Sequence, residues 1–266
     1  MASPSAPDQR LWATDSGANT LFKIDPATGK SDLIAVFSGL PSPFPNPNRN
    51  GQMSTDPVPT GVAVDKDGNA FVGFLSGFPF IPGSAGIVKV APDGKVSRYA
   101  TNLSMITDVV FGPDGQLYAL TFAELGDGQL NFGKGKILRV REGSESEVVV
   151  DGLHSPTALS FDRDGDAYVA IKSATAPGQG EVVVYKGLTR QPALGVVAPH
   201  SYNKSSDVAW VAGSSAATAA AIVPPPSTPA VDWSAVGLPL FALVCAAGAS
   251  VFFSIVWKRS ARARAG

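Results

Sequence analysis

Cysteine and histidine are almost missing from this chain of 266 residues. Cys245 is the only cysteine, so neither a disulfide framework nor a thiolate metal cluster can form within the chain. His154 and His200 are the only histidines, and their positions match no Ser/His/Asp arrangement and no histidine-rich metal spacing. We therefore expect both to be loop histidines, and the sequence predicts no metal and no cofactor.

Charge is also sparse, at 16% of residues, and it forms no basic stripe along the main part of the chain. All 22 acidic residues and 17 of the 21 basic ones precede residue 233. A protein that binds nucleic acid needs basic groups that displace counterions from phosphates. We therefore expect no nucleic-acid partner. The other basic residues lie at the C-terminus: Lys258, Arg259, Arg262 and Arg264.

Glycine and proline, in contrast, are plentiful, and a short segment repeats. Residues 60–68 (TGVAVDKDG), 107–115 (TDVVFGPDG) and 157–165 (TALSFDRDG) begin at threonines 47 and 50 residues apart. Each segment predicts an apolar strand, an Asp-Gly turn and the start of a second strand; third and fourth strands follow. Four-stranded units of about 45–50 residues are typical of β-propeller blades. The fold class is therefore all-β, a propeller of about four visible blades over residues 10–212.

How the ring closes is left open by the sequence. The first unit begins at Arg10 with a second strand and lacks an inner one, whereas residues 206–211 resemble an inner strand. If that segment joins the first blade, it closes a four-bladed ring and hides the last sheet edge. The alternative is an open arc of a larger, six-bladed ring, in which case the N-terminus is truncated. Residues 1–9 are expected to be disordered.

The longest apolar run lies near the C-terminus. Residues 236–257 carry no charge and, as a helix, would span about 33 Å, close to the thickness of a bilayer core. With Trp233 and Trp257 at the two ends, they predict one transmembrane α-helix over 233–257, although a buried core helix is the alternative. Residues 213–232, which are rich in Ala, Ser and Pro, are predicted to form a stalk between the propeller and this helix.

The basic residues after this run predict its orientation. By the positive-inside rule, residues 258–266 form a cytoplasmic tail and the propeller is extracytoplasmic, on a single-pass protein of the cell membrane. This orientation requires an export signal, and the first ten residues, MASPSAPDQR, have no apolar core of that kind. The alternative is a tail-anchored protein that faces the cytosol.

Several segments resemble known propeller families. Residues 11–19 and 21–29 are similar to blades of NHL-type or gluconolactonase-like propellers. Residues 58–64, followed by GFPF at 77–80, and residues 108–118 resemble the ScyD/ScyE family more narrowly. The likeness covers about residues 9–190. It implies an exported six-bladed propeller, so that four visible blades again point to a truncated N-terminus, and it implies no established biochemical role.

The gluconolactonase-like resemblance also implies a divalent metal at the channel mouth, held by acidic and amide side chains just before the inner strands. The matching positions here are Thr60, Thr107 and Thr157, and a hydroxyl is a poor replacement for a carboxylate on a hard cation. Together with Asp108, these threonines are the candidate site for a polar ligand. The alternative is that they only cap blade turns.

Two other segments are candidates for chemistry or binding. Residues 162–166 (DRDGD) resemble a calcium loop, but the Asp-Gly pair recurs in each repeat, which favours hairpin turns. The proline-rich residues 38–59, with Phe44 and Arg49, and residues 78–82 form a candidate binding surface, in which a packing role for Phe44, Phe78 and Phe80 is the alternative.

These observations favour a membrane-anchored, outward-facing propeller that acts as a binding or scaffolding module of the cell envelope. Its expected partners are the membrane, through the C-terminal helix, and an unknown protein or small polar ligand. The alternative function is a gluconolactonase-like hydrolase with its site at the channel mouth.

Overall fold

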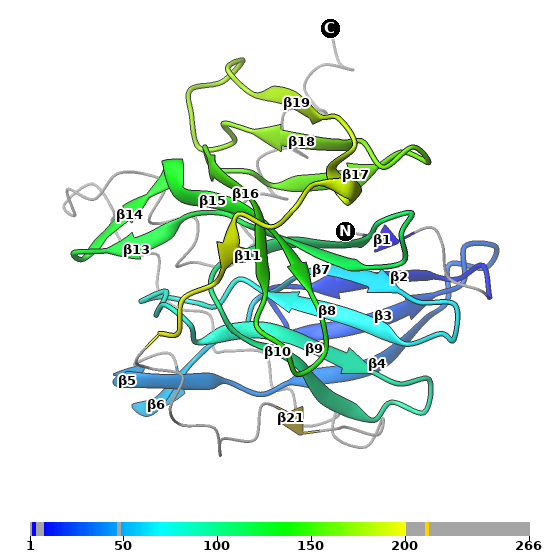
Figure 1. Cartoon of the computed structure of the whole chain (residues 1–266). Helices are drawn as coiled ribbons and strands as arrows, with labels where there is room; N and C mark the ends of the chain where they lie inside the picture. Colours follow the sequence, from blue (N-terminus) through cyan, green and yellow to red (C-terminus); the bar gives the residue numbers. More distant parts are fainter. Residues whose placement is uncertain (1, 4–7, 47–48, 201–210, 213–266) are drawn as a thin grey trace, which may run out of the picture.

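A computed structural model describes residues 2–3, 8–46, 49–200 and 211–212. Its described part is all-β, and four antiparallel sheets follow one another in chain order (Figure 1). The sheets are the blades that the repeat predicts. Within each blade most strands pair with their neighbours in sequence, as short strands joined by tight turns do.

The first two blades are built around neighbouring sheets. Blade 1 holds β2 (Leu11–Asp15), β3 (Thr20–Ile24) and β4 (Ser31–Phe37), with β1 (Ala2–Ser3) beside β2 and β21 (Val211–Ala212) beside β4. Blade 2 holds β7 (Pro59–Val64), β8 (Ala70–Phe74), β9 (Ala85–Val90) and β10 (Val96–Leu103). The hairpin of β5 (Leu40–Asn46) and β6 (Gln52–Thr55) lies between the two blades in sequence.

The other two blades differ in completeness. Blade 3 holds β11 (Ile106–Phe111), β12 (Leu117–Thr121), β15 (Gly135–Val140), β16 (Glu147–Leu153) and the late strand β20 (Gly195–Val196). Blade 4 holds β17 (Ala158–Phe161), β18 (Ala167–Ile171) and β19 (Glu181–Tyr185). Connections add the β13 (Glu124–Gly126) and β14 (Gln129–Asn131) hairpin and the 3-10 turns η2 (Phe132–Lys134) and η3 (Leu188–Arg190).

The predicted closing strand does not pair as the sequence suggests. Residues 206–210 lie outside the described residues, and Val211 pairs with Phe37 of β4, the outer strand of blade 1. The inner side of β2 is instead paired with Ala2–Ser3. The prediction of Val211 on an inner strand is therefore wrong, because apolar alternation identifies a strand but not the edge to which it adds.

The Asp-Gly turns are confirmed as hairpin turns. Gly68, Gly115 and Gly165 have φ of 81°, 74° and 83°, the left-handed region that favours glycine. In the segment that resembles a calcium loop, Asp162 Oδ1 accepts the backbone N–H groups of Asp164 and Asp166 at 3.0 and 2.9 Å. This carboxylate therefore shapes the turn between β17 and β18.

The hydrophobic core is divided into layers between neighbouring blades. One cluster joins blades 1 and 2 around Leu21 and Phe74, a second joins blades 2 and 3 around Ile87 and Leu117, and a third joins blades 3 and 4 around Leu120 and Val169. Among the described residues no buried cluster joins blade 4 to blade 1. On blade 4, Val182 and Val184 are 67% and 43% exposed, so the described blades form an open arc.

The predicted stalk (213–232), transmembrane helix (233–257) and cytoplasmic tail (258–266) lie outside the described residues. Within the part of the chain that the structure describes, no helix is long and apolar enough to cross a bilayer.

The close approach of β7 and β11 leads to a first prediction. A Cβ added at Gly61 would lie 2.6 Å from the backbone N of Val109 and 2.9 Å from the Cα of Asp108. Gly61→Ala should therefore push blades 2 and 3 apart and lower the free energy of unfolding by about 1–3 kcal/mol. Urea unfolding measures this change. Gly126→Ala in β13, where a Cβ meets no heavy atom within 4 Å, is the control, and an equal loss in both variants would contradict the packing argument.

Candidate functional site at the start of the inner strands

The connections into the inner strands share one backbone conformation. Val58, Met105 and Ser155 lie two residues before Thr60, Thr107 and Thr157, and have φ of 52°, 49° and 39°. The carbonyl oxygens of Val58 and Met105 accept the N–H groups of Leu75 and Phe122, both at 2.9 Å. Left-handed conformation is strained for such side chains, above all for a β-branched valine. The repeated hydrogen bond holds each connection, and with it the threonine, in an equivalent place.

Two of the threonines use their hydroxyls to join one blade to the next. Thr60 Oγ1 on β7 donates to the carbonyl of Ile106 at 2.7 Å, and Thr107 Oγ1 on β11 donates to the carbonyl of Pro156 at 3.1 Å. Each hydroxyl also lies 3.3 Å from a carbonyl of its own blade, at Gly73 and Leu120 respectively. Thr60 and Thr107 therefore link neighbouring blades by hydrogen bonds, and each such hydrogen bond is called a tie below.

Thr157 stands at the end of this series. Its backbone N–H donates to the carbonyl of Ala170 on β18 at 3.0 Å. Thr157 is thus positioned at the start of β17, as Thr60 and Thr107 are at the starts of β7 and β11. The acceptor of each hydroxyl comes from the following blade, and the described residues contain no blade after the fourth. Thr157 therefore has no equivalent tie within the described part of the chain.

Asp108 lies at the interface between blades 3 and 4, and its carboxylate accepts hydrogen bonds from backbone N–H groups. Its Oδ2 accepts the N–H of Leu159 on β17 at 2.9 Å, and its Oδ1 accepts the N–H of Val109 at 2.9 Å. The residue is only 8% exposed. Burial raises the pKa of the carboxyl to about 6, although the two backbone hydrogen bonds act in the opposite direction.

These four side chains do not form a fitting site for a divalent metal. A hard cation favours several carboxylate or carbonyl oxygens, whereas three of these four groups are hydroxyls, and the one carboxylate, that of Asp108, is buried and accepts two backbone N–H groups. Across the described residues, no group of three or more His, Cys, Asp or Glu is placed to hold a metal ion.

The proline-rich surface divides into a fixed part and an exposed part. Arg49 binds Asp56 Oδ1 through Nη2 at 2.6 Å and Nε at 3.1 Å, and Asn19 Nδ2 donates to the same oxygen at 3.0 Å. Asn48 lies outside the described residues. Phe80 is buried, whereas Phe44 and Phe78 are 60% and 70% exposed. The structure thus gives Phe80 a packing role and leaves Phe44 and Phe78 on the surface.

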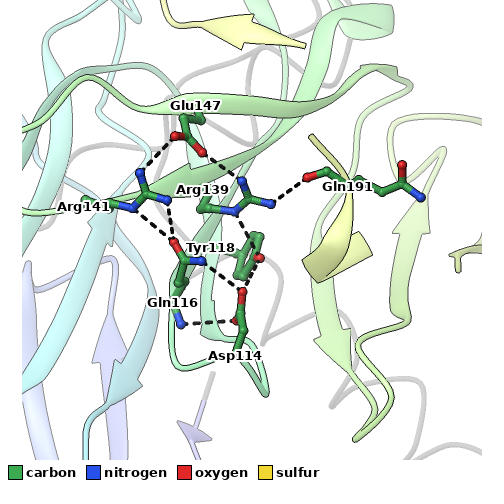
Figure 2. Close-up of polar contacts among 7 residues, drawn as sticks. All are labelled: Asp114, Gln116, Tyr118, Arg139, Arg141, Glu147 and Gln191. Carbon is green, nitrogen blue, oxygen red and sulfur yellow. Dashed lines mark hydrogen bonds and ion pairs between the residues drawn. The ribbon is translucent and has the colours of Figure 1, made fainter. Parts of the chain in front are cut away.

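A polar network on blade 3 was not expected from the sequence (Figure 2). Buried Arg139 donates to Tyr118 Oη at 3.3 Å, to Glu147 at 2.9 Å and to the carbonyl of Gln191 at 3.0 Å. Arg141 joins Glu147 to Gln116, and Tyr118 donates to Asp114. Hydrogen bonding from Arg139 lowers the pKa of Glu147. The network fixes the chain just after η3. Its only signal in the sequence was polar residues two positions apart, Gln116 with Tyr118 and Arg139 with Arg141.

Comparison with known proteins identifies the family. The sequence profile of the SMP-30/Gluconolactonase/LRE-like region matches residues 4–177. This chain belongs to that family. No curated protein sequence matches it. The gluconolactonase-like part of the resemblance is therefore confirmed, and the comparisons give no support to the ScyD/ScyE family in particular.

This chain spans only part of the solved structures described next. The PQQ-bound aldose sugar dehydrogenase of Streptomyces coelicolor is 18% identical, with a TM-score of 0.50 over 70% of this chain and 59% of that one. A gluconolactonase of Xanthomonas campestris is 18% identical over 71% and 60%, with a TM-score of 0.45. Regucalcin of Agrobacterium tumefaciens is 19% identical over 71% and 57%, with a TM-score of 0.42. The chain thus spans less than two thirds of these proteins, and the likeness shows the propeller fold alone.

The raised pKa of Asp108 leads to a prediction about pH. An acid whose pKa is about 6 in the folded state and near 3.8 when unfolded binds its proton more tightly when folded. The folded state therefore loses stability as the pH rises from about 4 to about 6. Relative to Asp108→Asn, which does not titrate, the unfolding free energy of the wild type should fall by up to about 1.4 kcal/mol per pH unit in this window. Urea unfolding of both proteins at pH 4, 5, 6 and 7 measures the difference, and parallel curves would contradict it.

Proposed function

We propose that this protein is a binding or scaffolding module of the cell envelope rather than a metal-dependent lactonase. The observation that carries the proposal is that the polar groups at the start of the inner strands form hydrogen bonds between neighbouring blades. Thr60 and Thr107 donate to the next blade, and Asp108 accepts from it. These groups serve the packing of the blades, and a set with one buried carboxylate among hydroxyls is poorly suited to a catalytic cation.

Exposed apolar side chains support a partner surface near the β5–β6 hairpin. Phe44 and Met53 on this hairpin are 60% and 55% exposed, and Phe78, whose carbonyl accepts the hydroxyl of Thr55 at 2.8 Å, is 70% exposed. Large apolar side chains that gather on a surface mark sites of interaction. This apolar surface supports a protein as the partner, whereas a small polar ligand would bind at the polar side chains of the inner strands.

The proposed cellular place rests on the sequence. The uncharged run at 236–257 and the basic residues after it support a single membrane anchor with the propeller outside and the tail in the cytoplasm. The GFPF segment at 77–80 supports a narrower kinship with the ScyD/ScyE propellers, which are exported.

The second candidate function is a gluconolactonase-like hydrolase, favoured by the family match over residues 4–177. Purified full-length protein should carry no stoichiometric divalent metal in elemental analysis and should hydrolyse glucono-1,5-lactone no faster than buffer, with or without added Ca²⁺ or Zn²⁺. The expected reason is that the carboxylate next to Thr107, that of Asp108, is buried and already accepts two backbone N–H groups. Bound metal together with hydrolysis that a chelator abolishes would establish the hydrolase instead.

The proposed orientation can be tested by cysteine labelling. Cys245 is the only native cysteine, so Cys245→Ser gives a background without thiols. In that background Ala27→Cys, on an exposed turn of blade 1, should react in intact cells with a maleimide that does not cross membranes. Ala263→Cys in the basic tail should react only after lysis. Labelling of the tail but not of blade 1 in intact cells would contradict the orientation.

A further inference from the structure

A cavity lies beside blade 3, away from the start of the inner strands. It is bounded by the end of β10, by β12, β15 and β16, and by residues 194–200, here called the return segment. Its volume is about 340 Å³, within the range of about 300–1,000 Å³ that small-molecule sites occupy. None of Thr60, Thr107, Asp108 and Thr157 lines it.

The return segment is held firmly enough to form a wall. Leu194 N–H donates to the carbonyl of Val148 at 2.7 Å, and Val197 N–H donates to that of Ser146 at 2.9 Å. On blade 2, Asn102 Nδ2 donates to the carbonyl of Ala198 at 3.0 Å. The segment therefore bridges the outer strands of blades 2 and 3 beside the cavity.

Most of the lining is apolar. Leu103, Leu138 and Val148 are buried in the blades, whereas Leu194 and Val196 on the return segment are 70% and 52% exposed. Large apolar side chains left in water beside a cavity favour an occupant that covers them. This side of the cavity therefore favours the apolar part of a bound molecule.

One end of the cavity is polar but electrically balanced. Lys136 Nζ lies 3.1 Å from Glu124 and 3.7 Å from Asp151, and Lys134 supplies a second positive charge. Two acids and two bases cancel, and an added anion would have to compete with both carboxylates for Lys136. The polar end therefore favours an uncharged group over an ion.

Thr121 is the hydrogen-bonding group that remains available at this end. It is 6% exposed, and its hydroxyl oxygen accepts the backbone N–H of Lys136 at 3.0 Å. No described residue accepts the hydroxyl proton of Thr121. The proton of this hydroxyl is therefore left for an acceptor in the cavity, and an oxygen of a bound molecule can serve as that acceptor.

We propose that this cavity is a binding site for a compact uncharged molecule with an apolar body and a carbonyl oxygen that accepts the Thr121 hydroxyl. The site is independent of the function proposed for the propeller, because it shares no residue with the surfaces that carry that proposal. His200 also lines it, and burial lowers the pKa of its imidazole, which keeps this neighbour neutral near pH 7 as well.

Benzophenone, an uncharged diaryl ketone that attaches to nearby C–H bonds under near-ultraviolet light, tests the proposal on the full chain. Mass spectrometry should find saturable labelling on peptides that hold the cavity lining, above all Leu103 and residues 194–200. Benzophenone-4-carboxylate, of similar size but anionic, should label them less. Labelling of the apolar run at 236–257 serves as an internal reference for partitioning. Labelling that does not saturate, or that spreads evenly over the blades, would overturn the proposal.

Three variants separate the cavity from the rest of the surface. Thr121→Val should raise the half-saturating concentration of benzophenone roughly three- to tenfold, whereas Thr121→Ser, which keeps the hydroxyl, should not. Gly195 lines the cavity and has room for a Cβ, so Gly195→Trp should occupy part of the cavity and abolish saturable labelling. Gly180→Trp before β19 is the matched control and should label as the wild type does. Unchanged labelling in both Thr121→Val and Gly195→Trp would disprove the site.

Discussion

The contact between one inner strand and the next is the constraint on which this structure depends. At β7 and β11 the backbones approach so closely that Gly61 has no room for a Cβ, and the hydroxyls of Thr60 and Thr107 bridge to the following blade. Apolar clusters then fill the wedge between neighbouring blades. Each blade thus relies on the next for both its polar and its apolar contacts.

This dependence explains why the polar residues at the start of the inner strands look like a site in the sequence. They recur at a fixed place because every blade needs the same tie, and a recurring Thr beside an apolar strand has no signature that separates a tie from a ligand. Asp108 is the exception within the series. It replaces the Gly61 and Ala158 of the neighbouring blades, and it is buried against Leu159 N–H. Burial is the main cause of its raised pKa.

The sequence predicted features that short-range rules determine. The Asp-Gly turns, the second strands and the division into four blades follow from local alternation and from glycine conformation. The pairing of Val211 with β4, of Gly195–Val196 with β16 and of Arg139 with Gln191 connects residues far apart in the chain. Such pairings depend on which sheet edge is free in three dimensions, and no periodicity in the sequence records that. The cavity beneath the return segment could not be foreseen for the same reason.

The return segment also covers the outer sheet edge of blade 3. After blade 4 the chain does not add a fourth described strand to β19; it passes through η3, is held at Gln191 by Arg139, and pairs with β16 of blade 3. An uncovered sheet edge invites pairing with other chains, and β20 on blade 3 and β21 on blade 1 each cover one. Covering β16 in this way places Leu194 and Val196 across a gap that blade packing alone does not fill. Protection of an edge therefore also forms the partly open cavity beneath the return segment.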